Sequence, residues 1–311
     1  MEFRQFFNFL VILKESIKLL AKNIKLTLFI TTLTLLSSSI FFVVFDFSSL
    51  SLARDMLAKE SLFPISSSSS AEFTTHLSRI QHSFPCLLAV YVVFVLSYLI
   101  ITLTSTTAII IVSSDSYNNK NSSLTELSSR IAKSWMRPLV TGFYTTIFVT
   151  GYVFLAISLA APFLASSSMD MLGAAVLFWA GAYGLYLYLC SVWILSLVVS
   201  VVDEDGSCGV EALGRSAVVM KGQRVSGFFV NVLCSVVSLG VYLGSRMTRG
   251  ERVCGLVLVN GSCLVKILTF VAYTVLYCRG KGSRGQEIEL NSSDVEYAKL
   301  GLITPLDSNV V

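Results

Sequence analysis

Lys266 is the one charged residue near the middle of an apolar run in this chain of 311 residues. An ionisable side chain at the bilayer centre costs about 3 kcal/mol and therefore marks a candidate functional site. Its ammonium group offers a positive charge for a lipid phosphate or a small solute, and the amide of Asn260 offers a second polar group nearby. We expect Lys266 and Asn260 to contact a lipid or solute.

A second interpretation of Lys266 needs no ligand. The last apolar run could begin only near Ser262, and the lysine would then extend to the headgroup layer while its methylene groups stay in apolar surroundings. Asn260, Gly261 and Ser262 interrupt the apolar sequence just before Lys266 and favour this alternative.

The acidic and cysteine residues show no pattern typical of an enzyme or a metal site. All 19 Asp and Glu lie outside the centres of the apolar runs, whereas proton-coupled transporters and intramembrane hydrolases place carboxylates there. The seven Cys form no CxxC pair, and no GxSxG, HExxH or P-loop motif occurs. We predict no catalytic, cofactor-binding or metal-binding residues. We also expect no nucleic acid partner, because no basic and aromatic patch is present.

Two features near the C-terminal end could direct the protein to partners or to lipid. Tyr297 and Leu300 are the first and last residues of a Tyr-x-x-Leu tetrapeptide, which has the form of a sorting signal bound by clathrin adaptors. A chance match is the alternative, since the pattern is short. Cys278 lies beside Arg279 and Lys281 and is a candidate for palmitoylation. A plain buried thiol is equally compatible with its position.

Composition places these residues in a membrane protein. The chain is 54% hydrophobic and 14% charged, with a mean hydropathy of +0.74, whereas soluble domains carry about 25% charged residues. Six apolar runs reach the roughly 20 residues that a helix needs to cross a bilayer. They are residues 26–45, 86–112, 139–164, 171–202, 225–244 and 253–278. We predict an all-α membrane protein with a 26–278 six-span domain, preceded by an amphipathic helix at 1–25 and followed by a flexible tail at 279–311.

The distribution of Lys and Arg predicts the orientation of the spans. Segments 1–25, 113–137, 203–224 and 279–311 hold 16 of the 23 basic residues, and the segments facing the other side hold 6. Cytosolic loops carry the excess of Lys and Arg, so we expect both termini in the cytosol. The membrane would be the endoplasmic reticulum, another endomembrane or the plasma membrane.

A short pattern precedes the first, third and fifth runs. Segments 15–22, 126–133 and 211–221 each open with Glu, close with Lys and lead into a span. Apolar residues at helical spacing lie opposite the charges, which is typical of a helix in the membrane interface. The apolar positions are Phe3, Phe6, Leu10, Leu13, Ile17 and Leu20, then Leu124, Leu127, Ile131 and Trp135, then Val210, Leu213, Ala217 and Met220. This indicates three repeats of a basic amphipathic helix plus two spans, although basic residues flank spans in most membrane proteins.

The segment WILSLVVSVVDEDG at 193–206, followed by EALGRSAVVMKG at 211–222, resembles an uncharacterised family of plant six-span membrane proteins. The opening ILKESIKLLAKN at 12–23, followed by a span, is similar to the same family, whose members are sometimes labelled polyadenylate-binding-protein-binding. The resemblance covers most of the chain, implies a multi-pass membrane protein and supplies no catalytic residues. More distantly, the arrangement of spans is similar to the membrane domain of some bacterial glycerophosphodiesterases, without their hydrolase part.

These features favour a non-enzymatic membrane organiser or adaptor in the secretory pathway. Its expected partners are membrane lipids, with anionic headgroups at the cytosolic face, and a clathrin adaptor or another cytosolic protein at the tail. Small-xxx-small pairs such as Gly240 and Gly244 could form a homo-oligomer face or pack within the bundle. The alternative function is a lipid or small-solute carrier, which predicts a polar cavity containing Lys266 and Asn260. A bundle packed shut by apolar side chains would favour the organiser.

Overall fold

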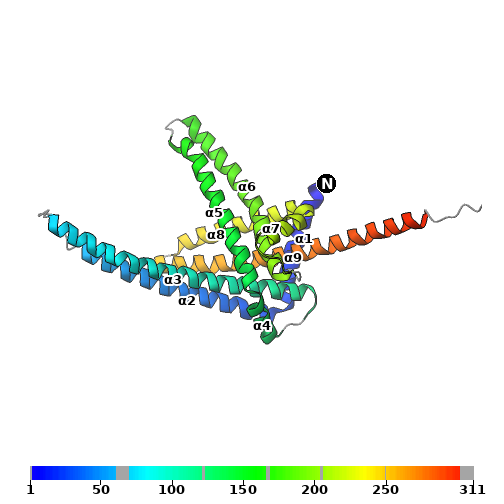
Figure 1. Cartoon of the computed structure of the whole chain (residues 1–311), viewed down its shortest axis with the longest axis horizontal. Helices are drawn as coiled ribbons and strands as arrows, with labels where there is room; N and C mark the ends of the chain where they lie inside the picture. Colours follow the sequence, from blue (N-terminus) through cyan, green and yellow to red (C-terminus); the bar gives the residue numbers. More distant parts are fainter. Residues whose placement is uncertain are drawn as a thin grey trace, which may run out of the picture.

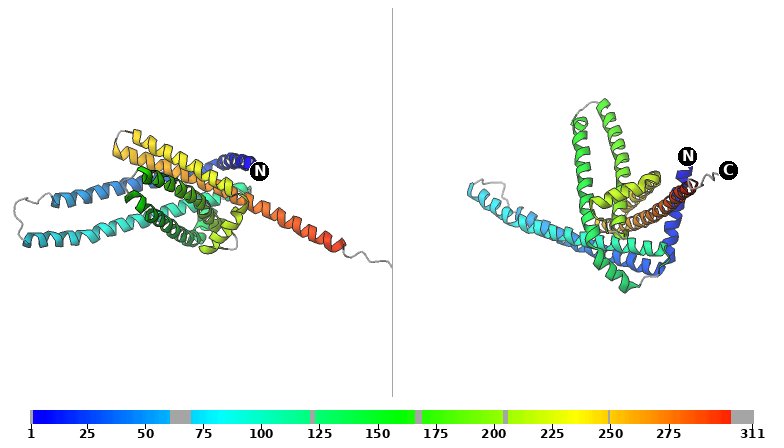
Figure 2. Two further views of the ribbon diagram at one scale, coloured as in Figure 1. Left: turned by 90° about the horizontal axis from the view of Figure 1, so that it is seen from above. Right: turned by 45° about the vertical axis from the view of Figure 1, so that its right-hand side comes forward.

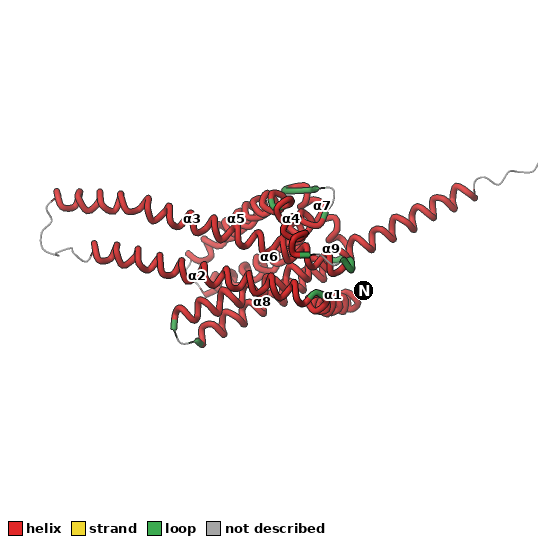
Figure 3. Tube along the Cα trace, turned by 90° about the horizontal axis from the view of Figure 1, so that it is seen from below, coloured by secondary structure: helices red, strands yellow, loops and turns green. Residues whose placement is uncertain are grey.

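A computed structural model describes residues 2–60, 70–120, 123–165, 169–203, 206–248 and 250–301. These residues are almost entirely helical and contain no β-strand (Figure 3). The helices are α1 (Glu2–Lys22), α2 (Ile24–Glu60), α3 (Ser70–Tyr117), α4 (Leu124–Ser134), α5 (Met136–Ala165), α6 (Met169–Val202), α7 (Val210–Val219), η1 (Met220–Gly222), α8 (Arg224–Met247) and α9 (Glu251–Gly301). The predicted fold class is confirmed, since six helices in this part of the chain are long and apolar enough to cross a membrane.

Each candidate span overlaps one of the predicted apolar runs. Across the described ranges they are Ile24–Ser51, Tyr91–Tyr117, Met136–Pro162, Gly173–Val202, Arg224–Arg246 and Glu251–Gly282. Three helices run well beyond their spans: α2 continues to Glu60, α3 begins 21 residues before its span at Ser70, and α9 continues to Gly301. The structure therefore has a helix through much of the 279–311 segment that the sequence predicts to be a flexible tail. Residues 302–311 lie outside the described part.

The described helices follow one order three times, a shorter helix and then two long antiparallel helices (Figure 1). The hairpins α2–α3, α5–α6 and α8–α9 meet at one end, where α3 and α6 finish and where α1, α4 and α7 lie. We call this the packed end. The α5–α6 hairpin points away from the other two, so the hairpin tips are separated (Figure 2).

Helix α9 lies at the centre of the packed end. Its residues 271–276 are all 1% exposed or less. Because successive residues turn by 100° around a helix, six consecutive buried residues leave no face open to the surroundings. Helices α1, α2, α3, α6 and α8 pack around α9, and residues 106–116 of α3 contribute a fully buried segment to the same core.

Buried polar side chains join α6, α8 and α9 inside this apolar core. The amide of Asn231 on α8 donates to the carbonyl oxygen of Leu187 at 2.8 Å and to the hydroxyl of Ser191 at 3.0 Å, both on α6. The hydroxyl of Tyr273 on α9 donates to the carbonyl oxygen of Gly227 at 3.1 Å. Hydrocarbon offers no competing partner for these groups, so the bonds fix the order and depth of the three helices.

Ion pairs attach the three shorter helices to the ends of the long ones. Asp115 at the end of α3 pairs with Arg130 of α4 at 2.7 Å. Asp203, directly after α6, pairs in the same way with Arg215 of α7 at 2.6 Å. At the third position the charges are reversed: Arg279 of α9 donates to Glu15 of α1 at 2.7 Å. This last pair joins the end of the third group to the start of the first.

The small residues divide into packed and open positions. Ala156 and Ala160 are buried on α5, which packs against α6. A Cβ atom added to Gly261 would lie 2.4 Å from Val241 Cγ1, so this glycine allows α8 and α9 to approach. By contrast, a Cβ at Gly184, Gly240 or Gly244 would meet nothing within 4 Å among the described residues. These three glycines are therefore open to contact with a second copy of the chain, and the homo-oligomer face stays a prediction.

The pair between Glu15 and Arg279 should contribute to stability. Glu15→Arg places a second cation opposite Arg279, and we expect the loss of about 1 kcal/mol that a partly exposed ion pair supports. This corresponds to a decrease of about 3 °C in the melting temperature of the detergent-solubilised protein. The double variant Glu15→Arg with Arg279→Glu should recover most of the loss.

The matched control is Lys18→Glu, which reverses an exposed charge on the same helix and should leave the melting temperature unchanged. Additive losses from the changes at Glu15 and Arg279 would show that the two side chains do not stabilise each other.

Candidate functional site

Lys266 lies at the middle of the last candidate span. It is 15 residues after Glu251 and 16 before Gly282, the two ends of that span, which corresponds to about 22 Å and 24 Å along the helix axis. Helix α9 is continuous through Asn260, Gly261 and Ser262. This geometry favours the interpretation of Lys266 as a charge within the membrane over the interpretation in which the span begins near Ser262.

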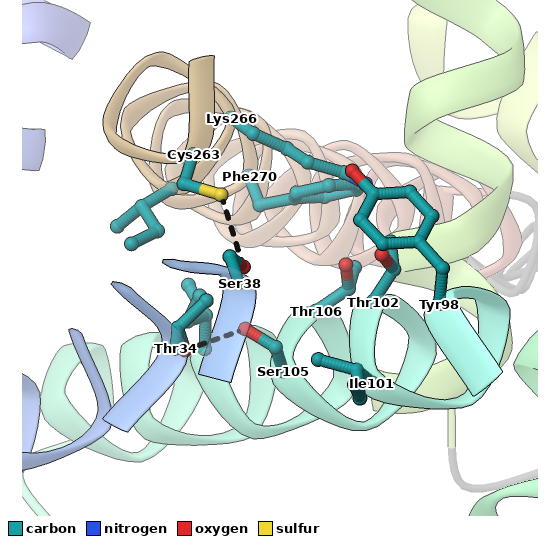
Figure 4. Close-up of a pocket in the computed structure, with 12 residues that line it drawn as sticks. Thr34, Ser38, Tyr98, Ile101, Thr102, Ser105, Thr106, Cys263, Lys266 and Phe270 are labelled. Atoms are coloured by element: carbon teal, nitrogen blue, oxygen red, sulfur yellow. Dashed lines mark hydrogen bonds between the residues drawn. The ribbon is translucent and has the colours of Figure 1, made fainter. Parts of the chain in front are cut away.

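Lys266 borders a cavity of about 30 Å³ between α2, α3 and α9 (Figure 4). Six of its twelve lining residues carry hydroxyl groups, although it lies among membrane-spanning segments. Its polar lining residues are Thr34 and Ser38 from α2, Tyr98, Thr102, Ser105 and Thr106 from α3, and Cys263 and Lys266 from α9. The volume is enough for one or two water molecules.

Hydrogen bonds hold part of this polar wall in place. The hydroxyls of Thr34 and Ser105 are 2.7 Å apart and join α2 to α3. The thiol of Cys263 donates to the hydroxyl of Ser38 at 3.4 Å and joins α9 to α2. Figure 4 shows both contacts and shows the Lys266 side chain extending across the cavity toward Tyr98.

Lys266 has no carboxylate partner among the described residues. It forms no hydrogen bond or ion pair there. On the neighbouring α2, the carboxylate of Asp46 is 3.2 Å from the guanidinium group of Arg252. One side of Lys266 is exposed on the outer surface of α9, between the buried Val265 and Ile267. A cation in these surroundings favours an anionic group that approaches along the helix surface, because the hydroxyls beside it carry no charge.

Asn260 does not share the cavity with Lys266. Its amide nitrogen donates to the carbonyl oxygen of Leu256 at 3.0 Å, and its amide oxygen accepts from Ser39 of α2 at 3.0 Å. These bonds give Asn260 a role in joining α9 to α2. The structure therefore brings Lys266 into a polar cavity and places Asn260 outside the cavity lining.

The other predicted sites lie toward the end of α9. Cys278 is half-buried and packs against the core at the packed end, four residues before the end of the candidate span. Its palmitoylation stays a prediction. Tyr297 and Leu300 fall in the terminal part of α9, for which the structure describes the backbone and not the side chains. Their use as a sorting signal stays a prediction as well.

The hydroxyl residues of the cavity were not identified from the sequence. Their signal is nevertheless present, because residues 31–39 read TTLTLLSSS and residues 102–107 read TLTSTT within apolar runs. Clusters of Ser and Thr in spans bond across helices or line polar cavities. Within the described residues, no three His, Cys, Asp or Glu side chains come together as a metal site.

A family model described as a domain of unknown function, DUF8558, matches residues 1–309. No curated protein and no solved structure matches the chain. The resemblances to plant six-span proteins and to the membrane domain of glycerophosphodiesterases are not tested by these comparisons and stay predictions.

Replacing Lys266 by Leu should keep the fold and raise the melting temperature in detergent. An ammonium group at the centre of a span costs about 3 kcal/mol, and the uncharged hydroxyls beside Lys266 recover only part of it. The measurement is the melting temperature of the purified variant together with its elution as a single peak.

Lys133→Leu removes an exposed lysine of α4 and serves as the control, with no expected change. If Lys266→Leu aggregates and Lys133→Leu does not, Lys266 stabilises the bundle. The idea that this lysine lowers the stability of the protein would then be wrong.

Proposed function

The chain belongs to the family described as a domain of unknown function, DUF8558, and we propose that this protein is a non-enzymatic organiser or adaptor of secretory-pathway membranes. It would bind anionic lipid headgroups through the shorter helices at the packed end. In this proposal the packed end faces the cytosol, in accord with the excess of Lys and Arg that its segments carry.

The observation that carries the proposal is the division of α1 into three faces. Phe9, Ile12 and Leu19 are buried against the bundle, and Leu10 and Ile17 are exposed beside them. Lys14 and Lys18 are exposed on the remaining side of α1, and Lys25 is exposed in the first turn of α2. A helix of this kind is held by the bundle while it presents apolar side chains to the hydrocarbon and lysines to the headgroups.

The other two shorter helices support the same reading. Leu127 of α4 and Ala212 of α7 are buried, and each directly follows the Glu that opens its segment, as the buried Ser16 follows Glu15 in α1. Lys133 and Lys221 are exposed near the ends of these segments. Each well-placed lysine contributes about 1 kcal/mol of attraction to an anionic membrane, so several on one face bind more strongly than one alone.

The packing of the core supports an organiser over a carrier. The six buried residues of α9 at 271–276 fill the centre of the packed end, and the cavity at Lys266 holds about 30 Å³. Pockets for small molecules usually have about 300–1,000 Å³. The interior around Lys266 is therefore too small for such a ligand, which favours a bundle that acts through its surfaces.

The extension of α9 supports the adaptor part of the proposal. Its backbone continues beyond the end of the candidate span at Gly282 to Gly301 and projects away from the packed end (Figure 1). A partner in the cytosol, such as a clathrin adaptor at Tyr297 and Leu300, would bind this segment.

A lipid or small-solute carrier is the second candidate, and Lys266 is the observation that favours it. The lysine is unpaired within the described residues and stands beside a hydroxyl-lined cavity at the depth of the bilayer centre. A carrier would bind the phosphate or carboxylate of its cargo at this ammonium group.

Native mass spectrometry of the protein purified in a mild detergent distinguishes the two functions. A stoichiometric protein partner that is lost when residues 283–311 are removed supports the adaptor. A discrete lipid or solute that survives delipidation and is lost in Lys266→Ala overturns the adaptor in favour of the carrier.

Changing Lys14, Lys18 and Lys25 together to Gln should weaken retention of anionic lipid by the purified protein. Each lysine contributes about 1 kcal/mol near an anionic surface, or about fivefold in affinity, so the triple change should lower the bound anionic fraction strongly. The measurement is the ratio of phosphatidylserine to phosphatidylcholine that copurifies from mixed micelles.

Arg246→Gln and Arg252→Gln, both close to the tip of the α8–α9 hairpin, form the control and should leave this ratio unchanged. Equal losses from the two sets of changes would show that the packed end has no preference for anionic lipid.

A further inference from the structure

A cleft opens at the packed end between α6, α7 and α9. Its volume is about 480 Å³. It is lined by Val199 and Asp203 near the end of α6, by Glu211, Gly214, Arg215, Val218 and Val219 of α7, and by Tyr277 and Lys281 of α9. We call it the α7 cleft. Neither Lys266 nor any residue of the cavity beside it contributes to this lining.

The α7 cleft lies where two candidate spans end. The span of α6 ends at Val202 and the span of α9 ends at Gly282, so Asp203 and Lys281 stand at the depth of the headgroups. Val199 and Tyr277 lie one turn deeper, and their exposed fractions are 1% and 5%. The cleft therefore has an apolar inner part within the hydrocarbon region and a charged rim at the membrane surface.

The rim holds two carboxylates and two cations, and the two cations differ in their contacts. Arg215 donates to Asp203 at 2.6 Å and to Glu211 at 3.0 Å, so each carboxylate of the rim has a cationic partner. Lys281 is exposed and has no carboxylate partner within the residues that the structure describes. The rim is therefore neutral overall, and among its described residues the ammonium group of Lys281 is the cation that a ligand can still contact directly.

We propose that the α7 cleft binds one glycerophospholipid, with its phosphate at Lys281 and one acyl chain along Val199, Val218 and Val219. A phosphate oxygen can accept a charge-assisted hydrogen bond from the ammonium group of Lys281. An acyl chain covers Val218, which is 41% exposed. Close packing of the chain against the cleft supplies the attraction, because the lipid tails that the chain leaves are equally apolar.

A phospholipid fits these features better than a soluble phosphate compound or a peptide. The apolar wall runs down from the headgroup depth into the span of α6, so it is reached from the bilayer. This inference goes beyond the proposed function, because it concerns a single bound lipid and requires only that α6 and α9 cross the membrane. It would hold equally for an organiser and for a carrier.

Gly214 provides a way to close the cleft without disturbing its walls. A Cβ atom at this position would meet nothing within 4 Å, and Gly214 is an interior position of α7 where other residues stabilise a helix better than glycine. Gly214→Phe should therefore fill the α7 cleft while the helix remains intact.

The test uses the full-length protein in detergent micelles with a phosphatidic acid that carries a photoactivatable group on its acyl chain. After irradiation, the labelled peptides are identified by mass spectrometry. Label is expected on the segments that contain Val199, Val218 and Tyr277. Lys281→Gln should lower the labelling of these segments about fivefold, and Gly214→Phe should abolish it.

Lys120→Gln is the matched control, since Lys120 is an exposed lysine that follows α3 and does not line the cleft. It should leave the labelling unchanged. If Gly214→Phe melts below the unchanged protein, Lys281→Gln alone decides the test.

Two results would overturn the proposal. Label spread over the exposed surfaces of α2, α5 and α8, with no effect of Lys281→Gln, would mean that lipid only surrounds the protein. Equal protection of the cleft by glycerol phosphate without acyl chains would identify a site for a soluble phosphate compound instead.

Discussion

The arrangement of the whole bundle depends on the central segment of α9, whose residues 271–276 are enclosed on every side. An enclosed helix has to be met by neighbours that interlock with its own side chains, because close packing replaces the hydrophobic effect between helices in lipid. The bonds of Asn231 and Tyr273 then set the depth at which α6 and α8 lie against each other and against α9. The packed end forms around this centre, and the hairpin tips remain free to separate.

The fold was largely predictable from the sequence, whereas the arrangement of its spans was not. An apolar run of about 20 residues has one stable conformation in hydrocarbon, since each backbone amide has to bond within the helix. The runs at 139–164 and 225–244 therefore identify α5 and α8 directly. Which spans touch depends on a few side chains, such as Gly261 beside Val241, and no periodic pattern reveals such a pair.

The candidate site shows the same division. Lys266 stands out in the sequence because a charge is rare in a span. Its hydroxyl neighbours come from α2 and α3, and only the structure identifies them. Asn260 was expected to join Lys266, yet the two are six residues apart, which is about 1.7 turns of a helix. They consequently face different directions, and Asn260 bonds to Ser39. Proximity in sequence predicted a shared site that the geometry of the helix does not allow.

The contact between Glu15 and Arg279 also has a consequence for how the protein is made. The two residues are separated by 264 positions, and a ribosome that adds about 5–20 residues per second needs about 13–50 s to cover that length. During this interval α1 is already synthesised, while the helix that will hold it does not yet exist. Helix α1 is thus synthesised long before α9, one of the helices that bury it. Its packed position is complete only after α9 has been made.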